Sequence, residues 1–557
     1  MKKLIVILLS VVMAMGCLGF VACGNNDSSD TIRLMTWHNE DESYYKAIRE
    51  AGDSYEELTG TEVKIIVQEL TGYKSVLDTQ FKSKSAPDII DLQMDLRKTY
   101  ADLGQLYDFT SVYNQKSAYS DAATWVDSLK GGINGFTKTK SNNKYGAITF
   151  VPCFQDPTLY TIQPLLVNVD ILLAAGVTQE EIDRKPQTWK EMTDMMDKVI
   201  AYNEENDKEI IPWGQIIDFF GWTLGNIISQ FGEGYYSEIL TDATYDSVKQ
   251  YEAELGDTIF DCMYRTGGLL QTQDVPYYEG MMEFFREFMQ KYCQTGWESS
   301  TYDATNALFF NQQVAFLQVG NWLQADIVEE CKDFNYTYFP VPLITEESMQ
   351  GSEAQKTAAK YLSGKFPGAD GQFTEGFSVP ASLAENPEKL EKTIDFLQYL
   401  TSKDIQKKVS TTAVAGSPTE GVEAPQDLLD YSLTEDQIEE AGGAQGLILG
   451  GYLFERADIW PDLNNYALGS SDAKTTTELI AYAKEKIKQS RDESLQDLAA
   501  EDGLTAIFAD AKSALAAAQA DETSGEAYIQ SLQDNVNLIE ARIKVVNAYG
   551  GLNIPLN

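Results

Sequence analysis

Strand patterns alternate with helix patterns along residues 31–92, and this order limits the fold more than any other feature of the sequence. The strand-like runs are 32–37, 63–67 and 89–92, and apolar side chains recur at helical spacing over 44–58 and 73–81. Gly60 follows the first helix and Pro87 the second, as helix stop signals do. Because strands that are joined through helices need crossover connections, we expect a parallel sheet with helices on both faces.

Sheets of this kind bind ligands just beyond the carboxyl ends of their strands. Polar and aromatic side chains follow the three predicted strands at those ends: Trp37, His38, Asn39 and Glu40; Gln68 and Glu69; Gln93, Met94 and Asp95. We therefore predict that Trp37, His38, Glu40 and Asp95 belong to a ligand-binding site. For Trp37, packing in the core is an equally good interpretation.

Residues 145–177 indicate that the chain passes from one globular half into another. A strand-like run, 147–151, ends at Pro152, which has no amide hydrogen for a β-ladder. A second apolar run, 165–169, leads into a helix. A chain of 557 residues is also too long for one hydrophobic core, so we predict at least two lobes, with polar Asp156 at the crossing between them.

Three later segments give weaker signals. Thr188 and Glu191 have the spacing of a capping box, which predicts the start of a helix. Residues 314–319 are an apolar run that predicts a strand. The aromatic-rich region 213–236 and residues 345–371 show no clear periodicity, and we expect them to be mainly loops.

Residues 1–22 form a predicted targeting segment. Lys2 and Lys3 precede an apolar run that is shorter than the roughly 20 residues of a membrane-spanning helix. The residues up to Cys23 then resemble a bacterial lipoprotein signal, in which this cysteine is lipidated after cleavage, and residues 23–30 would form the tether. We therefore predict a Gram-positive-type lipoprotein that is anchored to the membrane on the extracellular face of the cell.

Six cysteines are present. Cys17 is a rival lipidation site, but cleavage there would leave apolar residues on the mature end; an ordinary secretory peptide is a further alternative. The cysteines beyond the signal are Cys153, Cys262, Cys293 and Cys331, and none lies in a C-x-x-C spacing. We interpret them as free thiols in the core, with a Cys262–Cys293 disulfide as the alternative outside the cell.

The composition excludes several functional classes. The 43 basic and 85 acidic side chains give a formal net charge of −42, which repels nucleic acid and anionic lipid headgroups. His38 is the only histidine, which nearly excludes His-based catalytic triads and His-rich metal sites. No nucleophile elbow, P-loop or zinc-protease motif is present. We expect no enzyme activity, cofactor, metal or nucleic-acid partner, although chance pairs among so many acids leave a glycosidase open.

Short motifs follow one another along the chain in a characteristic order. They lie at 85–88, 104–110, 144–152, 166–177, 186–189, 310–322, 377–380 and 396–402. Each motif is weak alone. In this order, behind a lipoprotein signal, they resemble the extracellular solute-binding proteins of sugar ABC importers, the family of maltose- and multiple-sugar-binding proteins. The matching stretches run from Thr31 to about Ile487.

This resemblance implies an α/β protein with the two-lobed, type II periplasmic-binding-protein-like fold, in which mainly parallel sheets are flanked by helices and a hinge joins the lobes. The implied lobes are 31–148 plus 375–414 and 149–374 plus 415–557, and the implied hinge comprises 148–152, 373–376 and 415–418. The sequence departs from the family at Asn142–Asn143, where Asp-Gly is usual. Further departures are apparent insertions at 232–280 and 419–450 and extra C-terminal helices after Ser490.

Sugars offer apolar ring faces and many hydroxyl groups, so a sugar site needs aromatic plates together with carboxylates or amides. Family members place a stacking aromatic at the position of Trp322 and a hydroxyl-binding carboxylate at that of Asp156. Core packing is the alternative for Trp322, and a turn beside Pro157 is the alternative for Asp156. Trp222 and Trp460 are further candidate plates, for which packing is the better interpretation.

The resemblance thus implies a monomeric, lipid-anchored protein that captures a carbohydrate, expected to be a neutral oligosaccharide. It would deliver this ligand to the transmembrane subunits of an ABC permease without covalent chemistry. Three alternatives stay open: a surface lipoprotein that degrades glycans, a binding protein for a non-sugar solute such as a polyamine or a peptide, and a sensor that presents its ligand to a receptor kinase.

Overall fold

The structure is a computed structural model. It describes residues 31–40, 42–132, 136, 148–157, 159, 164–232, 235–367, 376–429, 441–442, 453–454, 457–500, 503–520 and 526–556. The predicted signal segment, the tether and Cys23 lie outside these residues. In the part that is described, no helix combines the length and the apolar character needed to cross a membrane. In the same part, no group of three or more His, Cys, Asp and Glu side chains is arranged to hold a metal ion.

The first lobe is built on a four-stranded sheet with the order β2-β1-β3-β9. Its strands are β1 (Thr31–Thr36), β2 (Glu62–Val67), β3 (Ile89–Leu92) and β9 (Gly376–Ser378). β1 pairs in parallel with β2 and β3, whereas β9 returns from far along the chain and pairs antiparallel with β3. The parallel sheet predicted for residues 31–92 is therefore confirmed, and a distant segment adds an edge strand.

Helices cover both faces of this sheet, because successive strand residues point to opposite sides. The helices are α2 (Ser43–Thr59), α3 (Leu70–Ser83), α4 (Met94–Asp102), α19 (Pro387–Leu400) and α20 (Lys403–Ala413). Leu34 packs in the core under α2, α19 and α20, and its neighbour Met35 packs in the core under α3 and α4. α2 ends at Gly60, whose φ of +76° is the left-handed C-cap conformation that glycine adopts without strain.

The second lobe has its own four-stranded sheet with the order β5-β6-β4-β7. Its strands are β4 (Leu165–Asn168), β5 (Ile211–Gly214), β6 (Val314–Gln318) and β7 (Tyr336–Phe339). β5 and β6 are parallel, but β4 is antiparallel to both of its neighbours. The expectation of mainly parallel sheets therefore holds for the first lobe only. A short run that is buried on both faces, as β4 is, carries no sequence signal for its direction.

Helices surround this second sheet. They are α7 (Val169–Ala174), α8 (Gln179–Arg184), α9 (Trp189–Asn206), α10 (Phe220–Ile228), α15 (Tyr278–Tyr292), α16 (Tyr302–Phe310), α17 (Gln324–Glu330), α18 (Glu353–Ala358) and α24 (Trp460–Leu468). Two of them, α18 and α24, pack on α15. The predicted capping box of Thr188 and Glu191 begins α9. By contrast, α10 and α18 are helices in regions that we expected to be loops.

Shorter elements complete the described chain. The helices and strands are α5 (Thr110–Tyr113), α11 (Tyr235–Ile239), α14 (Leu269–Thr272), α21 (Gln426–Leu429), β8 (Phe366–Pro367) and β10 (Ala441–Gly442). The 3-10 helices are η1 (Val126–Ser128), η2 (Ile217–Phe219), η3 (Lys249–Tyr251), η4 (Trp297–Ser299), η5 (Asn321–Leu323), η6 (Glu346–Ser348), η7 (Ala359–Tyr361) and η8 (Ala381–Glu385).

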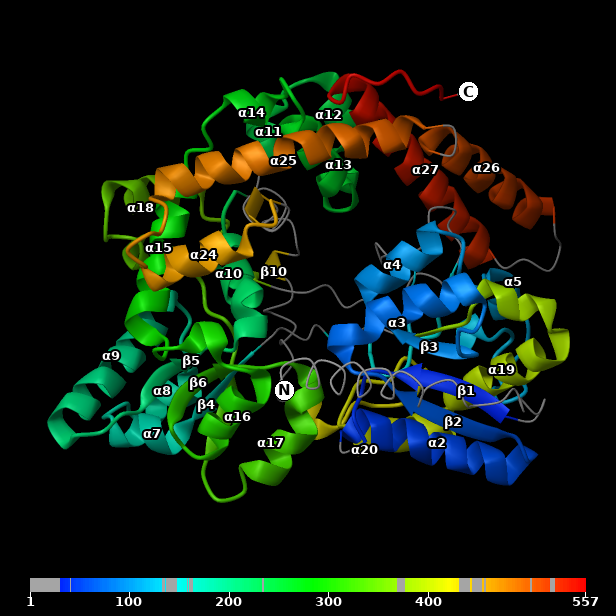
Figure 1. Cartoon of the computed structure of the whole chain (residues 1–557), viewed down its shortest axis with the longest axis horizontal. Helices are drawn as coiled ribbons and strands as arrows, with labels where there is room; N and C mark the ends of the chain where they lie inside the picture. Colours follow the sequence, from blue (N-terminus) through cyan, green and yellow to red (C-terminus); the bar gives the residue numbers. More distant parts are fainter. Residues whose placement is uncertain are drawn as a thin grey trace, which may run out of the picture.

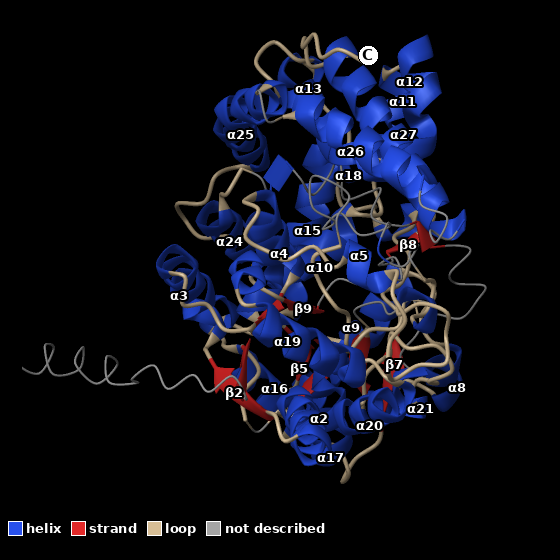
Figure 2. Ribbon diagram, turned by 90° about the vertical axis from the view of Figure 1, so that its right-hand side faces the viewer, coloured by secondary structure: helices blue, strands red, loops and turns tan. Residues whose placement is uncertain are grey.

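A group of five helices, which we call the helical layer, lies over the two lobes (Figure 1). It comprises α12 (Ala243–Val248), α13 (Glu252–Tyr264), α25 (Thr476–Ala499), α26 (Leu504–Ala520) and α27 (Glu526–Ala548). Buried residues recur at alternating spacings of four and three in both helices of the α26–α27 hairpin: Leu504, Phe508, Ala511, Leu515 and Ala518, and Leu532, Val536, Ile539, Ile543 and Val546. This is the spacing by which paired helices interlock their side chains. Figure 2 shows the layer above the rest of the molecule from the side.

The predicted hinge segments meet where the chain passes between the lobes. Val151 and Phe377 form an antiparallel bridge, with backbone hydrogen bonds of 2.8 and 2.9 Å. A Cβ on Gly376 would lie 2.5 Å from the carbonyl oxygen of Val151, so glycine permits this close approach. Leu129 forms a second bridge with Thr419, which directly follows the third predicted hinge segment, 415–418. The lobe boundaries themselves stay a prediction.

All four cysteines in the described chain are free. Cys153, Cys262 and Cys331 are buried, and Cys293 is partly buried. The interpretation as core thiols is confirmed, and the alternative of a Cys262–Cys293 disulfide is wrong. Burial raises the pKa of Cys262 to about 12, so this thiol has little tendency to form the thiolate that disulfide exchange requires.

Candidate ligand-binding site

Trp37 and His38 follow β1 directly, at the carboxyl end of the first-lobe sheet. Their ring centroids lie 3.9 Å apart, and the planes are tilted by 32°. His38 is only 2% exposed, whereas Trp37 is partly buried. His38 therefore supports the Trp37 ring from the protein side, and Trp37 is the more exposed member of the pair.

Two carboxylates hold the imidazole of His38. Its Nδ1 lies 2.9 Å from Oε2 of Glu42, and its Nε2 lies 3.8 Å from Oδ2 of Asp91. Burial alone would raise the pKa of Glu42, but the hydrogen bond and charge of His38 help to lower it below its ordinary value. Burial raises the pKa of Asp91 in spite of His38 and of a hydrogen bond from Thr36. The orientation of the imidazole ring is thus set by a carboxylate at each of its two nitrogens.

The indole nitrogen of Trp37 is buried and, among the described residues, has no hydrogen-bond partner. Buried N–H groups without a partner are rare in native proteins, because each costs free energy comparable to a lost hydrogen bond. An acceptor from outside the chain, such as a sugar hydroxyl, would satisfy this donor. Trp37 therefore combines a partly buried aromatic ring with a buried N–H that has no partner among the described residues, and its contact with a ligand stays a prediction.

Replacement of Trp37 by phenylalanine tests this donor, because the change keeps an aromatic ring and removes the N–H. We expect the affinity for the cognate ligand to fall about fivefold, which corresponds to roughly 1 kcal/mol for one hydrogen bond. Thermal stability should change little, because no protein group loses a hydrogen-bond partner. Calorimetric titration and thermal denaturation check both expectations. An unchanged affinity would show that the indole N–H meets no ligand.

The second lobe contributes four aromatic side chains, Phe219, Trp222, Tyr302 and Trp322, which we call the aromatic cluster. Phe219 and Trp222 are stacked with centroids 4.2 Å apart, and Trp322 meets Trp222 edge to face at 5.4 Å. Trp322 also donates a hydrogen bond of 3.0 Å from Nε1 to the hydroxyl of Tyr302. The predicted residues Trp222 and Trp322 thus lie together, in contact with two residues that were not predicted.

The local sequence explains how Trp322 reaches this position. It lies in η5, just after the buried strand β6 and Gly320. A Cβ on Gly320 would lie only 2.3 Å from the indole ring, so glycine allows the ring to fold back over the backbone. Trp222 comes from α10, and Tyr302 begins α16. A strand end and two helices therefore converge to build the cluster.

Trp322 packs against two apolar clusters. One is the core around β6 of the second lobe, and the other extends from the first-lobe sheet and Tyr44 to Phe154, just past the predicted hinge segment 148–152. Burial is the main cause of the raised pKa of Tyr302, and the negative charge of Glu42, from the other lobe, adds to it. The end of β1 and the aromatic cluster therefore lie close to each other at the junction of the lobes.

Asp156, the predicted sugar-binding carboxylate, forms an ion pair with Lys130. The two side chains are only 4% and 12% exposed, and the Lys130 ammonium also donates to the carbonyl oxygen of Val422 at 2.7 Å. A Cβ on Gly416 would lie 2.6 Å from the backbone nitrogen of Asp156, so the chain segments around these two residues approach each other closely. Asp156 thus lies beside the predicted hinge segments 148–152 and 415–418, and its contact with a ligand stays a prediction.

The remaining predicted residues differ in their surroundings. Glu40 is exposed, in the loop after β1. Asp95 lies in the first turn of α4, and its side chain is outside the described residues. Trp460 packs over α10, where its Cη2 would lie 3.3 Å from a Cβ at Gly221, and its ring lies 6.3 Å from that of Phe220. Packing, the better of the two interpretations for Trp460, fits these contacts.

Sequence reasoning missed Glu42, Phe219, Tyr302 and Lys130. A signal existed for Glu42, because it lies four residues after the only histidine, at the start of a predicted helix. Phe219 and Tyr302 lie in segments that carry neither a strand end nor a family motif. Lys130 pairs with a residue 26 positions away, which no local pattern could indicate.

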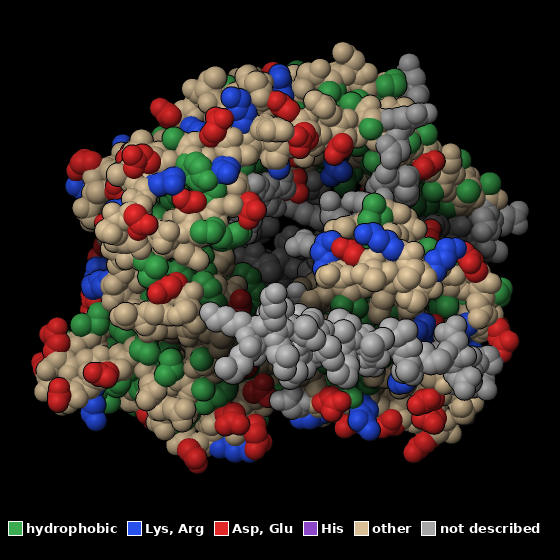
Figure 3. Space-filling view, in the orientation of Figure 1, with side chains coloured by type: hydrophobic (Ala, Val, Ile, Leu, Met, Phe, Trp, Pro, Cys, Tyr) green, Lys and Arg blue, Asp and Glu red, His purple; other side chains and the backbone are tan. Residues whose placement is uncertain are grey.

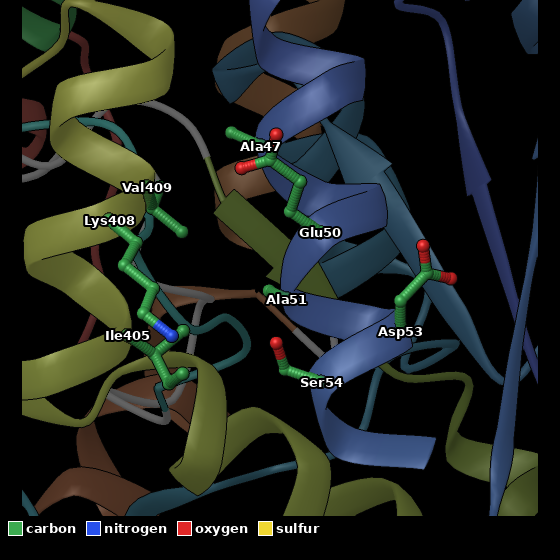
Figure 4. Close-up of a pocket in the computed structure, with 8 residues that line it drawn as sticks. All are labelled: Ala47, Glu50, Ala51, Asp53, Ser54, Ile405, Lys408 and Val409. Carbon is green, nitrogen blue, oxygen red and sulfur yellow. The ribbon is translucent and has the colours of Figure 1, made fainter. Parts of the chain in front are cut away.

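A separate cavity lies in the first lobe between α2 and α20 (Figure 4). It has a volume of about 300 Å³ and is lined by Ala47, Glu50, Ala51, Asp53, Ser54, Ile405, Lys408 and Val409. No aromatic side chain lines this cavity, so it lacks the flat apolar face that a sugar ring needs. The junction of the lobes is the better candidate site.

Comparison with known proteins gives one family and many similar folds. A family model described as bacterial extracellular solute-binding protein matches residues 50–436. A search of the curated proteins finds no match. Among solved structures, the GacH receptor of Streptomyces glaucescens, studied unliganded and with acarbose, has a TM-score of 0.54 at 15% identity. That match covers 82% of this chain and 96% of the receptor.

Two further structures are similar. A chitin oligosaccharide binding protein has a TM-score of 0.54 at 15% identity, over 84% of this chain and 100% of that protein. A sugar transporter from Bacillus licheniformis in complex with stachyose has a TM-score of 0.51 at 15% identity, over 82% of this chain and 98% of that protein. At these identities the likeness concerns the fold, and the predicted two-lobed fold is confirmed.

Proposed function

Because this chain belongs to the bacterial extracellular solute-binding proteins, we propose that it captures a neutral oligosaccharide between its lobes and delivers it to the permease of an ABC importer. The ligand would be bound by ring stacking and hydrogen bonds and released unchanged, without covalent chemistry. Closing of the lobes would follow from the higher affinity of the ligand for the closed state.

The observation that carries this proposal is the position of Trp322. Its indole belongs to the aromatic cluster of the second lobe and packs against the apolar cluster that extends from the first-lobe sheet to the predicted hinge. Aromatic faces bind apolar surfaces such as the carbon–hydrogen faces of sugar rings, and the unpaired N–H of Trp37 suits a hydroxyl acceptor. The similar proteins that were solved with acarbose and with stachyose support a sugar as the ligand class.

The charges at the junction favour a neutral ligand. Glu42 and Asp91 both lie against His38, and Asp156 is paired with Lys130. Carboxylates that already have cationic or hydrogen-bonding partners offer little to a polyamine, and the net charge of −42 disfavours an anion. Hydroxyl groups, which donate and accept hydrogen bonds without charge, fit these conditions best.

We also propose that Cys23 carries the lipid that anchors the protein on the outer face of the cell membrane, and that the protein acts as a monomer. The sequence supports this part of the proposal through the basic residues, the apolar run and the small residues before Cys23. The proposed rigid bodies are 31–148 plus 375–414 and 149–374 plus 415–557. Mass spectrometry of the membrane-extracted protein would detect the acyl groups on Cys23.

A ligand screen tests the proposed function. Raffinose, stachyose, acarbose and chitin oligosaccharides are compared with spermidine and a short peptide in thermal denaturation, followed by calorimetry. A ligand at one hundred times its Kd should stabilise the protein by about 2.7 kcal/mol. Binding of spermidine or the peptide alone would favour a non-sugar solute, and new reducing ends after incubation would indicate an enzyme. No stabilisation by any sugar would contradict the proposal.

A further inference from the structure

Glu42 occupies the N-cap position of α2, but its side chain does not cap the helix. The side chain of an N-cap residue usually accepts a hydrogen bond from the first helical turn, which stabilises the helix. Here the carboxylate turns back onto the loop that follows β1. Its Oε1 accepts hydrogen bonds from the backbone nitrogen and Nδ2 of Asn39 at 3.1 and 3.0 Å, and its Oε2 lies 2.9 Å from Nδ1 of His38. Both oxygens of Glu42 thus bind the loop that begins with Trp37.

The inner side of the same loop is tied to the first-lobe sheet. The backbone N–H of His38 donates to the hydroxyl of Thr36 at 3.2 Å, and this hydroxyl donates to Oδ2 of Asp91 at 2.7 Å. Asp91 is only 6% exposed, whereas the side chain of Glu42 is 37% exposed. Glu42 is therefore the outer of the two carboxylates that hold His38, and it is the one that can be exchanged without opening the core.

The imidazole of His38 lies in the middle of a series of aromatic rings. On one side is Trp37, with centroids 3.9 Å apart, and on the other side is Tyr44, at 4.9 Å. Tyr44 in turn stacks on Phe154 at 4.1 Å. Ring contacts alone allow a range of tilt angles, whereas hydrogen bonds are directional and orient the imidazole through its nitrogens. The groups that hold His38 therefore also set the tilt of the Trp37 ring, which is 32° from the imidazole plane.

The charge of Glu42 also acts on the second lobe. It helps to raise the pKa of Tyr302, a member of the aromatic cluster, above its ordinary value. A ligand that fills the junction of the lobes would displace water from a carboxylate at this place, and the loss of water from an unpaired charge is costly. His38 and Asn39 are partners that remain in place when the water leaves. A sugar can therefore bind here without contacting the carboxylate.

We propose that Glu42 is a positioning residue of the ligand-binding site, which sets the tilt of the Trp37 ring through its hydrogen bond with His38. This inference rests on the proposed function, in which Trp37 meets the sugar, and it adds a residue that acts on the sugar without touching it. A sugar ring stacks best on an aromatic face that is already oriented, because ordering a loose side chain costs free energy on binding. Loss of the Glu42 charge therefore weakens binding although every ligand contact is kept.

Replacement of Glu42 by glutamine removes this charge and keeps an oxygen acceptor for Asn39. The matched control is Glu50→Gln, the same exchange at an exposed position of α2, where the carboxylate accepts a hydrogen bond from Thr412. Acidic side chains are spread over both lobes on the face shown in Figure 3, so the loss of any one charge changes the overall field little. We expect Glu42→Gln to lower the affinity about tenfold, and Glu50→Gln to change it by less than about twofold. Calorimetry uses whichever of raffinose, stachyose, acarbose and chitin hexasaccharide stabilises the unchanged protein most.

Two readouts separate positioning from folding. His38 is the only histidine, so the NMR spectrum of the intact protein without a histidine tag contains one imidazole to follow. Glu42→Gln should move this signal and Glu50→Gln should not, while thermal denaturation shows that both variants are folded. The second readout is a double-mutant cycle with His38→Asn. Because Glu42 acts through the imidazole, adding Glu42→Gln to His38→Asn should change the affinity by less than about twofold.

The outcomes distinguish this inference from the proposed function. If none of the four sugars binds the unchanged protein, the proposed function fails, and the inference fails with it. If a sugar binds and Glu42→Gln binds it equally well, the proposed function stands and the positioning role is wrong. An equal loss for Glu42→Gln with and without His38→Asn would overturn the inference as well, because Glu42 would then act on the sugar directly. An imidazole signal that Glu42→Gln leaves in place would show that Glu42 does not hold His38.

Discussion

Replacement of Lys130 by methionine is expected to lower the free energy of unfolding by about 3–5 kcal/mol, the usual loss when one partner of a buried ion pair is removed. Lys130 and Asp156 are 12% and 4% exposed, so water cannot replace the lost ammonium. The carbonyl oxygen of Val422 loses a donor as well. Methionine keeps most of the length of the lysine stem, so the change removes the charge and leaves much of the packing. Urea denaturation, followed by tryptophan fluorescence, measures the loss.

Two further variants test whether the loss in Lys130→Met comes from the buried ion pair. Lys74 pairs with Asp78 on α3, where the side chains are 56% and 36% exposed, so Lys74→Met should change stability by less than about 1 kcal/mol. The double variant Lys130→Met with Asp156→Asn should be more stable than Lys130→Met alone, because it leaves no buried charge without its partner. Equal losses for Lys130→Met and Lys74→Met would contradict the stabilising role of this buried ion pair.

The fold of the first lobe could be predicted because its signals are local. In residues 31–92, apolar side chains alternate in the strands and recur at helical spacing in the helices, and Gly60 marks the end of a helix. In the second lobe, the Thr188 cap marks the start of α9 in the same local way. The direction of β4 could not be predicted, because four fully buried residues look the same in either direction. α10 was missed because its aromatic and glycine residues weaken the helical pattern, and it is held by packing against α15 and Trp297.

The site could be predicted only in part. Trp37, His38 and Trp322 follow strands, and strand ends are marked in the sequence. The contacts that turn these residues into a site join distant segments, such as Trp322 with Tyr302 and with the first-lobe core. For Asp156 the position after Pro152 indicated a ligand-binding carboxylate. In the structure this carboxylate forms an ion pair with Lys130. Residue type and position indicated where to look, and only tertiary contacts show what each side chain touches.

Replacement of Trp322 by alanine is expected to lower the affinity for the cognate oligosaccharide by about 2–4 kcal/mol, a loss of about 30-fold to 1,000-fold. Trp322 packs against the second-lobe core and against the cluster that extends from the first-lobe sheet to Phe154, so its removal takes away an aromatic face and a contact at the junction. The hydroxyl of Tyr302 loses one hydrogen-bond donor, and Trp222 loses its edge-to-face neighbour. Calorimetric titration of the variant measures the loss.

Matched exchanges distinguish a ligand contact from a general loss of packing. Trp322→Phe keeps a ring at the junction, so most of the stacking should remain and the affinity should fall less than in the alanine variant. Trp297→Phe makes the same exchange at a buried tryptophan of the second lobe, which stacks on Phe220 with centroids 5.0 Å apart. It should lower the melting temperature and leave the affinity unchanged. If Trp322→Ala stays folded and binds the oligosaccharide with its original affinity, the junction of the lobes is not where the ligand binds.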